Sequence, residues 1–229
     1  MKRADLQRLM KGIMVGMVGI LVLGGYGRCE AAPATPTQAI RVLNQKVERY
    51  RFEDSEAARQ ANRDLKKEIL TGTFDLEKLC ALAMTTHWKD RSAKEKEEFV
   101  ALMRDLLERK AILSVEQGSS KQKKFHSVVR SEKFFDPNQA KAFVHTTINV
   151  PAEDLTIALD YKLSLIKGEW KVYDVIVDGA SLVANYRAQF DKIISKDGYP
   201  ELIHRMQNKL KDLKQKEGEG TAASHGPSV

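Results

Sequence analysis

Hydrophobic residues along this chain change their spacing twice. Up to residue 113 they recur every three or four positions, which predicts a series of amphipathic helices. From residue 124 to 177 they alternate with polar residues, which predicts a meander of about four antiparallel strands with one buried face. Helical spacing returns from residue 182 to 210. The predicted first helices cover 35–54, 55–70 and 75–84, followed by a long helix that begins near residue 93.

Short polar motifs mark the boundaries between these elements. Ser92 and Glu95 form the S-x-x-E pattern of a capping box, and Asp178 is placed as the N-cap of the helix after the strands. Pro151 and Gly168 fall between predicted strands. The order of helices, sheet and helices indicates an α+β fold, with helices packed on the concave face of a curved antiparallel sheet. Such a sheet encloses a volume that core side chains or a ligand fill.

The N-terminal segment has the layout of a secretory signal peptide. Basic residues precede the apolar run 12–23, which is too short to span a bilayer comfortably. We place cleavage between Ala31 and Ala34, so that 1–34 is the signal peptide, 35–213 the folded domain and 214–229 a disordered tail. An uncleaved anchor is the alternative. A lipoprotein site at Cys29 is disfavoured by the residues before it.

The charge and cysteine content exclude some classes of protein. Residues 1–34 hold five basic and two acidic residues, so their removal lowers the formal net charge from +7 to +4. A charge this mild does not indicate a nucleic-acid partner. Cleavage also leaves Cys80 alone in an apolar stretch, where it forms no intramolecular disulfide and is interpreted as a buried small hydrophobic residue.

The sequence contains no recognisable catalytic, metal-binding or cofactor-binding motif. Its five histidines are scattered, and no phosphate loop or G-x-S-x-G occurs. Ser181 is interpreted as a capping or buried hydroxyl, and Asp174 as the partner of a cation, because Asp174 and Asp178 lie too far apart along a strand for a catalytic pair. A small enzyme remains an alternative, with these candidate residues: Asp174, Tyr173, Tyr186 and Arg187.

One segment resembles a known family. Residues 170–190 read WKVYDVIVDGASLVANYRAQF, which is similar to the signature of the MlaC family. These toluene-tolerance auxiliary proteins are the periplasmic phospholipid-binding component of the pathway that maintains lipid asymmetry. Segments 74–88, 92–107 and 198–210 also resemble the family, so the similarity covers roughly residues 40–212. Met84-Thr85 and the absence of a Tyr near Ala111 depart from the family pattern and bear on ligand size.

The resemblance implies a lipid carrier without catalysis or a cofactor. It implies a deep pocket between sheet and helices, with acyl chains inside and the headgroup outside. The implied partners are phospholipid, an inner-membrane transporter complex with an ATPase and an outer-membrane lipoprotein complex. A hopanoid-type or other hydrophobic ligand is the alternative cargo. A small periplasmic enzyme on the same scaffold and a ligand-free assembly protein are the alternative classes.

The expected pocket wall combines three apolar stripes. Two stripes lie on helices and one on the sheet, and we expect both helical stripes to pack on the apolar sheet face. The long helix contributes Leu102, Met103 and Leu106, the sheet Leu159, Tyr161, Leu163 and Val172, and the following helix Leu182, Tyr186 and Phe190.

Overall fold

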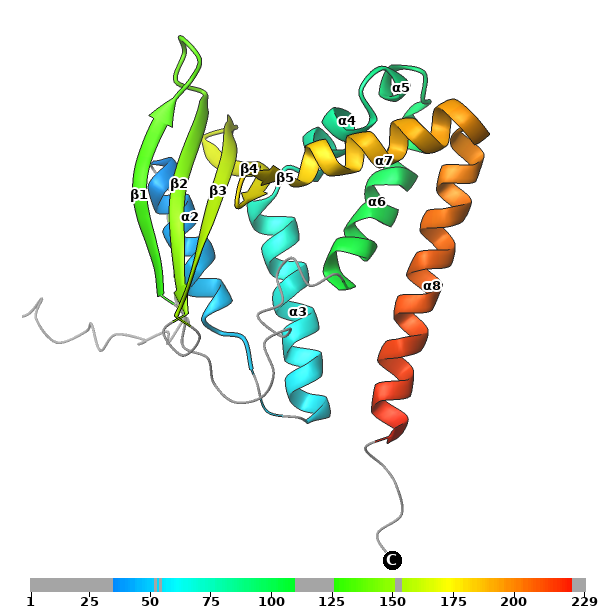
Figure 1. The fold of residues 1–229 in the computed structure, drawn as a ribbon, viewed down its shortest axis with the longest axis horizontal. Coiled ribbons are helices and arrows are strands. Elements are labelled where there is room, and N and C mark those ends of the chain that lie inside the picture. The colour runs from blue at the N-terminus through cyan, green and yellow to red at the C-terminus, as the bar shows by residue number, and fades with distance from the viewer. Residues whose placement is uncertain (1–34, 52, 54, 110–125, 151–153, 224–229) are drawn as a thin grey trace, which may run out of the picture. The chain divides into compact units, whose positions relative to one another are not determined.

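Helices, a sheet and two further helices follow one another along the chain, as hydrophobic spacing predicts (Figure 1). The computed structural model describes residues 35–51, 53, 55–109, 126–150 and 154–223. All of these residues belong to one compact unit, Ala32–Val229. The first helices are α2 (Pro36–Val47), α3 (Glu56–Thr73), α4 (Leu76–Met84), α5 (Thr86–Lys89) and α6 (Ala93–Arg109).

Side-chain caps explain where these helices begin. Thr35 Oγ1 accepts the Gln38 backbone N–H at 3.1 Å, and Gln38 Oε1 accepts the Thr35 N–H at 3.2 Å. Before α6, Glu95 accepts the Ser92 backbone N–H at 2.8 Å and donates its own to Ser92 Oγ at 3.3 Å. The predicted capping box is therefore confirmed. The rest of the predicted long helix, beyond Arg109, lies outside the described residues.

Five antiparallel strands form one sheet in sequence order. They are β1 (His126–Phe134), β2 (Lys141–Val150), β3 (Leu155–Ile166), β4 (Glu169–Val177) and β5 (Ala180–Ser181). The first four confirm the predicted meander. The two-residue β5 was not predicted, and its pairing with β4 carries the sheet past the point where the next helix was expected.

Asp178 is not the cap of the following helix, so that prediction is wrong. Asp178 and Gly179 have φ angles of 46° and 83°, and together they make the tight turn from β4 to β5. The Asp178 carboxylate accepts the Ala158 backbone N–H at 2.9 Å instead. The helix α7 (Leu182–Asp197) begins after Ser181, whose Oγ accepts a first-turn N–H at 3.0 Å. The capping role predicted for Ser181 is confirmed.

The last helix runs further than composition suggests. Gly198, with φ of 86°, separates α7 from α8 (Tyr199–Ala223), as predicted. The helix continues beyond Lys214, where the disordered tail was expected to begin. Residues 214–217 are Lys, Gln, Lys and Glu, whose high helix propensity favours continuing the helix past Lys214, although Gly218 and Gly220 beyond them have low propensity. Residues 224–229 and the predicted signal peptide 1–34 lie outside the described residues.

Helix α2 covers one face of the sheet, which we term the inner face. The register pairs Val144 with Tyr161, and both are buried on this face. At one end of α2 the Thr37 N–H donates to Glu132 of β1 at 2.8 Å, and towards the other end Asn44 donates to Ser127 of the same strand at 2.8 Å. The helix is therefore anchored along its length to the edge strand.

Helices α4, α6, α7 and α8 pack mainly against one another. Phe99 of α6 lies edge-on to Phe190 of α7 at 5.6 Å between ring centroids and to Trp88 at 6.2 Å. This helical layer joins the sheet at the edge of β4, where the Asp75 N–H donates to the Val172 carbonyl at 2.8 Å. Lys171 Nζ donates to the Gly72 carbonyl beside it at 2.6 Å. The helices therefore meet the sheet along a strand edge as well as on its inner face.

Candidate functional site

The ten residues expected to form a pocket wall belong to one continuous apolar cluster. The seven members with almost no exposed surface are Met103, Leu106, Tyr161, Leu163, Val172, Tyr186 and Phe190. The three half-buried members that pack against them are Leu102, Leu159 and Leu182. The predicted residues therefore belong to a common cluster, and three of its members keep some exposed surface.

The apolar stripe of α7 has helices as its partner. The rings of Tyr186 and Phe190 stack at 5.3 Å, and Phe190 contacts Phe99 of α6. Helix α7 contacts α4 and α8 along its length and reaches the sheet near β4 and β5. The expectation that the sheet face is the available partner for this stripe is wrong, because the short helix α4, which precedes the sheet in the chain, packs against α7 and supplies apolar surface of its own.

The sheet residues share the inner face as alternation predicts. Leu163 pairs with Ala142 on one side and with Val172 on the other, and all three are fully buried. The register shifts between Lys162 and Leu163, because β4 carries one extra residue, Tyr173. This β-bulge lets Val172 and Val175 both face inward although they are three residues apart.

One half of the inner face is closed and the other half is open. The buried pairs lie towards the β1–β2 and β3–β4 turns. Towards the opposite end the same face carries four apolar side chains that are only half-buried and lie around the fully buried Thr146, which we term the open strip: Val129, Ile148, Ile157 and Leu159. Sequence reasoning named only Leu159 of these four. The period of two could have identified the others, but it does not show which part of a face stays uncovered.

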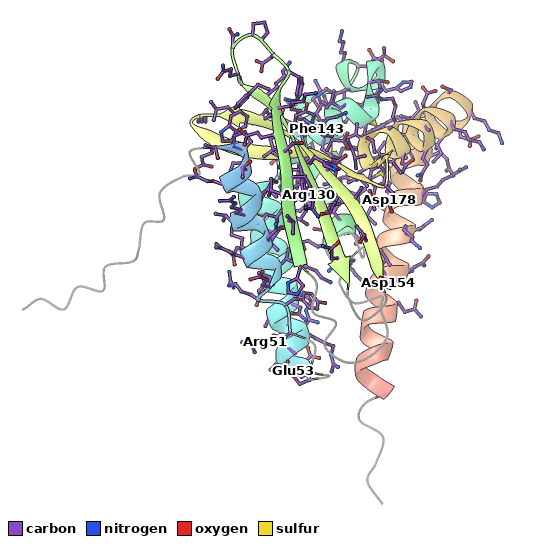
Figure 2. The ribbon with its side chains drawn as sticks, turned by 60° about the vertical axis from the view of Figure 1, so that its left-hand side comes forward. Arg51, Glu53, Arg130, Phe143, Asp154 and Asp178 are labelled. Carbon is purple, nitrogen blue, oxygen red and sulfur yellow. The ribbon has the colours of Figure 1, made fainter. Side chains whose placement is uncertain are left out.

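Polar residues lie at the end of the fold that the open strip approaches. Figure 2 shows Arg51 and Glu53, from the α2–α3 connection, at the same end as Asp154 at the start of β3, and Phe143 at the other end. Asn62 of α3 holds the connection by accepting the Arg51 N–H at 2.9 Å and donating to its carbonyl at 2.7 Å. The Lys66 ammonium lies 5.6 Å from the centre of the Tyr50 ring. Charged residues of the α2–α3 connection and of the start of β3, which we term the charged rim, therefore lie at the same end of the fold as the open strip.

Titratable groups within the cluster are held neutral. Burial raises the pKa of the Cys80 thiol to about 12 and that of the Tyr186 hydroxyl to about 12. Burial also raises the pKa of Tyr161. All three groups therefore stay protonated at neutral pH, and the interpretation of Cys80 as a buried small residue is confirmed. The cluster presents an uncharged apolar surface.

The residues named for a catalytic alternative have structural partners. Asp174, which is 3% exposed, accepts the Ser181 hydroxyl at 2.8 Å and the Val183 N–H at 3.1 Å, and lies 3.5 Å from Lys162 Nζ. The predicted cation partner of Asp174 is thereby confirmed. Arg187 donates to the Leu82 carbonyl at 3.2 Å. These contacts fix the start of α7 on β4.

Within the part of the chain that the structure describes, no three His, Cys, Asp or Glu side chains gather in a way that could hold a metal ion. None of the helices described is both long and apolar enough to cross a membrane.

Comparison with known proteins identifies the family. The family described as "MlaC protein" matches residues 36–208, three-quarters of the chain. The chain belongs to the MlaC family. A relative in this family is the intermembrane phospholipid transport system binding protein MlaC of Haemophilus influenzae, 24% identical over 149 residues. The match covers 63% of this chain and 66% of that protein, slightly less than two thirds of its length.

A solved structure of a phospholipid-binding protein has the same fold. The phospholipid-binding protein of Ralstonia solanacearum, determined in complex with a phospholipid, superimposes with a TM-score of 0.62. The match covers 80% of this chain and 98% of that one at 20% sequence identity. The α+β architecture with an antiparallel meander is therefore shared with that protein.

Proposed function

We propose that this MlaC-family chain is a periplasmic carrier that binds a phospholipid by its acyl chains. The observation that carries the proposal is the open strip, an apolar half of the inner sheet face that the described helices leave half-exposed. A lipid chain laid on Val129, Ile148, Ile157 and Leu159 covers this surface, and its headgroup reaches the charged rim at the end of the strip.

The names of the similar proteins support this proposal. The Haemophilus relative is described as the binding protein of an intermembrane phospholipid transport system, and the Ralstonia protein was solved with a phospholipid. In this chain the open strip spans Ile157 to Leu159 along β3, about 7 Å at the rise of a β-strand, and the inner face continues beyond it to the buried Leu163. One leaflet of a bilayer is about 15 Å of hydrocarbon, so the open strip covers about half the length of an acyl chain.

The energetics of lipid transfer explain why an apolar site without catalytic groups suits this task. Each methylene exposed to water costs about 0.8 kcal/mol, so free crossing of an aqueous compartment is very slow for a two-chain lipid. A site that covers the chains removes this barrier. A site that leaves the headgroup in water avoids the larger cost of burying a charge.

We further propose export through a signal peptide at residues 1–34 and exchange of lipid with two membrane complexes. The basic residues and the apolar run 12–23 support export. The partners are an inner-membrane transporter complex with an ATPase and an outer-membrane lipoprotein complex, in keeping with the name of the Haemophilus relative.

Extraction of the purified protein with organic solvent, followed by mass spectrometry, tests the proposal. We expect close to one phospholipid per chain. A hopanoid or another lipid in the extract would establish the alternative cargo, and a protein that releases no lipid and takes up no fluorescent phospholipid would contradict the carrier function.

A variant pair locates the bound lipid. Leu159→Gln places an amide on the open strip and is expected to lower lipid occupancy about tenfold, because a desolvated polar group costs about 1–3 kcal/mol. Val128→Gln makes the same kind of change at an exposed position that pairs with Thr147 on the opposite face. It is expected to retain its lipid. Equal occupancy in both variants would exclude the open strip as the site.

A further inference from the structure

Two turns of the meander meet at the end of the sheet furthest from the open strip. In an antiparallel meander the β1–β2 and β3–β4 turns lie at one end and the β2–β3 connection at the other. The Leu165 N–H donates to the Ala140 carbonyl at 2.9 Å, which ties the β3–β4 hairpin to the β1–β2 turn. Figure 1 shows the β1–β2 turn extending beyond the strands at this end.

Four large apolar side chains are exposed at this end, and we term them the hairpin-end patch. They are Phe134 (42% exposed), Phe135 (52%), Leu165 (41%) and Ile166 (37%). Among the described residues, the two other large apolar side chains with this much exposure, Val128 and Val177, lie elsewhere on the sheet. The exposed apolar surface is therefore concentrated at one place.

The patch is continuous with the core. The Phe134 ring lies 6.0 Å from the Trp170 ring, and Trp170 pairs with Leu165 across the β3–β4 hairpin. At about 200 Å² for a large side chain, the four residues expose on the order of 300 Å². Apolar patches of this size on a monomer are frequently functional.

The turns hold these side chains in place. Asp136 accepts the backbone N–H groups of Ala140 at 3.2 Å and Lys141 at 2.7 Å, which closes the β1–β2 turn. In the other turn Lys167 and Gly168 have φ angles of 50° and 83°, the left-handed pair of a tight hairpin. Both turns are ordered by their own hydrogen bonds and backbone geometry, so the apolar side chains remain outside the core.

Basic residues surround the patch. Lys133, Lys141 and Lys167 are exposed on the same strand ends and turns, and Lys171 is paired with Glu169 at 2.6 Å. The carboxylate of Asp136 accepts backbone N–H groups of the turn and keeps its negative charge. Four lysines against the two acidic residues Asp136 and Glu169 leave a net charge of +2 around the apolar side chains.

We propose that the hairpin-end patch docks the protein onto the surface of a bilayer that contains anionic lipid. Phenylalanine and leucine enter the boundary between headgroups and acyl chains, and the surrounding lysines meet anionic headgroups. This inference concerns contact with a membrane and goes beyond the binding of a lipid in the open strip.

Charge and area favour a membrane over a protein copy as the partner. A second copy would bring one set of lysines against another, which is repulsive. A stable protein interface buries about 800 Å² on each partner, well above what the four side chains expose. A protruding pair of hairpin turns inserts into a soft surface without needing a complementary shape.

Flotation with lipid vesicles tests the proposal. The protein as exported is mixed with vesicles of phosphatidylglycerol and phosphatidylethanolamine, or of phosphatidylcholine alone. We expect it to float with the anionic vesicles and to remain below the neutral ones. Every variant has the same N-terminus, so residues 12–23, if retained, contribute equally to all of them.

Matched variants assign the binding to the patch. The double variant Phe135→Ser, Ile166→Thr is expected to lower vesicle partitioning about tenfold. Its control, Val128→Thr with Val177→Thr, removes two equally exposed apolar side chains elsewhere and should bind as the parent does.

A second set tests the charges. Reversal of the three patch lysines to Glu is expected to lower partitioning by at least fivefold for each lysine. The same reversal at exposed Lys192, Lys196 and Lys209 changes the net charge equally and should have a much smaller effect.

Three results would overturn the proposal. The first is a parent protein that floats with neither vesicle. The second is a loss of binding in the control variants as large as in the patch variants. The third is an envelope protein that the parent protein captures and the patch variant does not, with no vesicle binding by either. That result would assign the patch to a protein partner. Lipid extracted from the same patch variants reports separately on the carrier function, because the open strip is intact in them.

Discussion

Replacement of Asp174 by Asn isolates the contribution of one buried carboxylate to the junction between sheet and helix. Asp174 is 3% exposed, accepts the Ser181 hydroxyl and the Val183 N–H, and lies 3.5 Å from Lys162. The Asn side chain has almost the same shape, but it carries no charge and has one acceptor oxygen. It therefore cannot satisfy all three partners.

The magnitude follows from the exposure of the partners. Breaking a fully buried ion pair costs about 3–5 kcal/mol. The Lys162 side chain is 38% exposed, so water stabilises its charge once the carboxylate is lost and the cost falls below that range. The weakened charged hydrogen bonds and the lost charge at the start of α7 remain. We expect a loss of about 2–3 kcal/mol, which for a domain of this size lowers Tm by about 5–10 °C.

Asp178→Asn is the matched control. Asp178 is exposed, its φ of 46° is tolerated by Asn, and the Asn carbonyl still accepts the Ala158 N–H. We expect a change within about 0.5 kcal/mol. Urea unfolding followed by circular dichroism measures both variants. If Asp178→Asn destabilises as much as Asp174→Asn, or if Asp174→Asn is neutral, the assignment of the junction to Asp174 is wrong.

Two further predictions concern the buried cluster. Leu163→Ala removes a fully buried side chain between two strands and should cost about 2–5 kcal/mol in urea unfolding, and a value below 1 kcal/mol would contradict its place in the core. Because burial raises the pKa of Cys80 from 9.0 to about 12, its thiol should not react with a thiol reagent at pH 8 until the protein unfolds. The same shift means that the contribution of Cys80 to the free energy of unfolding is at its full value below pH 9 and falls as the pH rises towards 12, since the thiol of the unfolded chain ionises first. Reaction of native Cys80 at the rate of a free thiol would show that Cys80 is open to solvent. Unchanged stability between pH 9 and 11 would show the same.

Short sequence motifs predicted most of the helices and strands. Where a motif fits both a helix start and a hairpin turn, contacts with other segments decide between the two. Ser92 and Glu95 identified the start of α6 because a capping box needs only four consecutive residues. Asp178 and Gly179 were assigned to a helix start although Asp-Gly is also the strongest short signal for a hairpin turn. The pairing of β5 with β4 decides between the two, and two residues are too short a strand to be recognised by alternation.

The sequence predicted which residues share the inner face, but it did not predict which of them stay partly exposed. Alternation placed Tyr161, Leu163 and Leu159 on one face, as observed. It gave no sign that Leu163 is fully buried while Leu159 is half-buried, because this difference depends on where the helices lie over the sheet. It also led to the wrong partner for Tyr186 and Phe190, since a helical stripe shows that a surface is buried without showing what covers it.

The contact between Phe74 and Val172 has a consequence for the order of folding. This bridge and the Lys171–Gly72 hydrogen bond close a loop of about a hundred residues, so the entropy of loop closure must be overcome before either contact is made. The strands β1 to β4, by contrast, pair with their neighbours through short turns. Under the proposed export with the N-terminus first, α2 to α4 emerge before β4 does. Docking of the helices onto the β4 edge then waits for the last long strand and is the step that completes the domain.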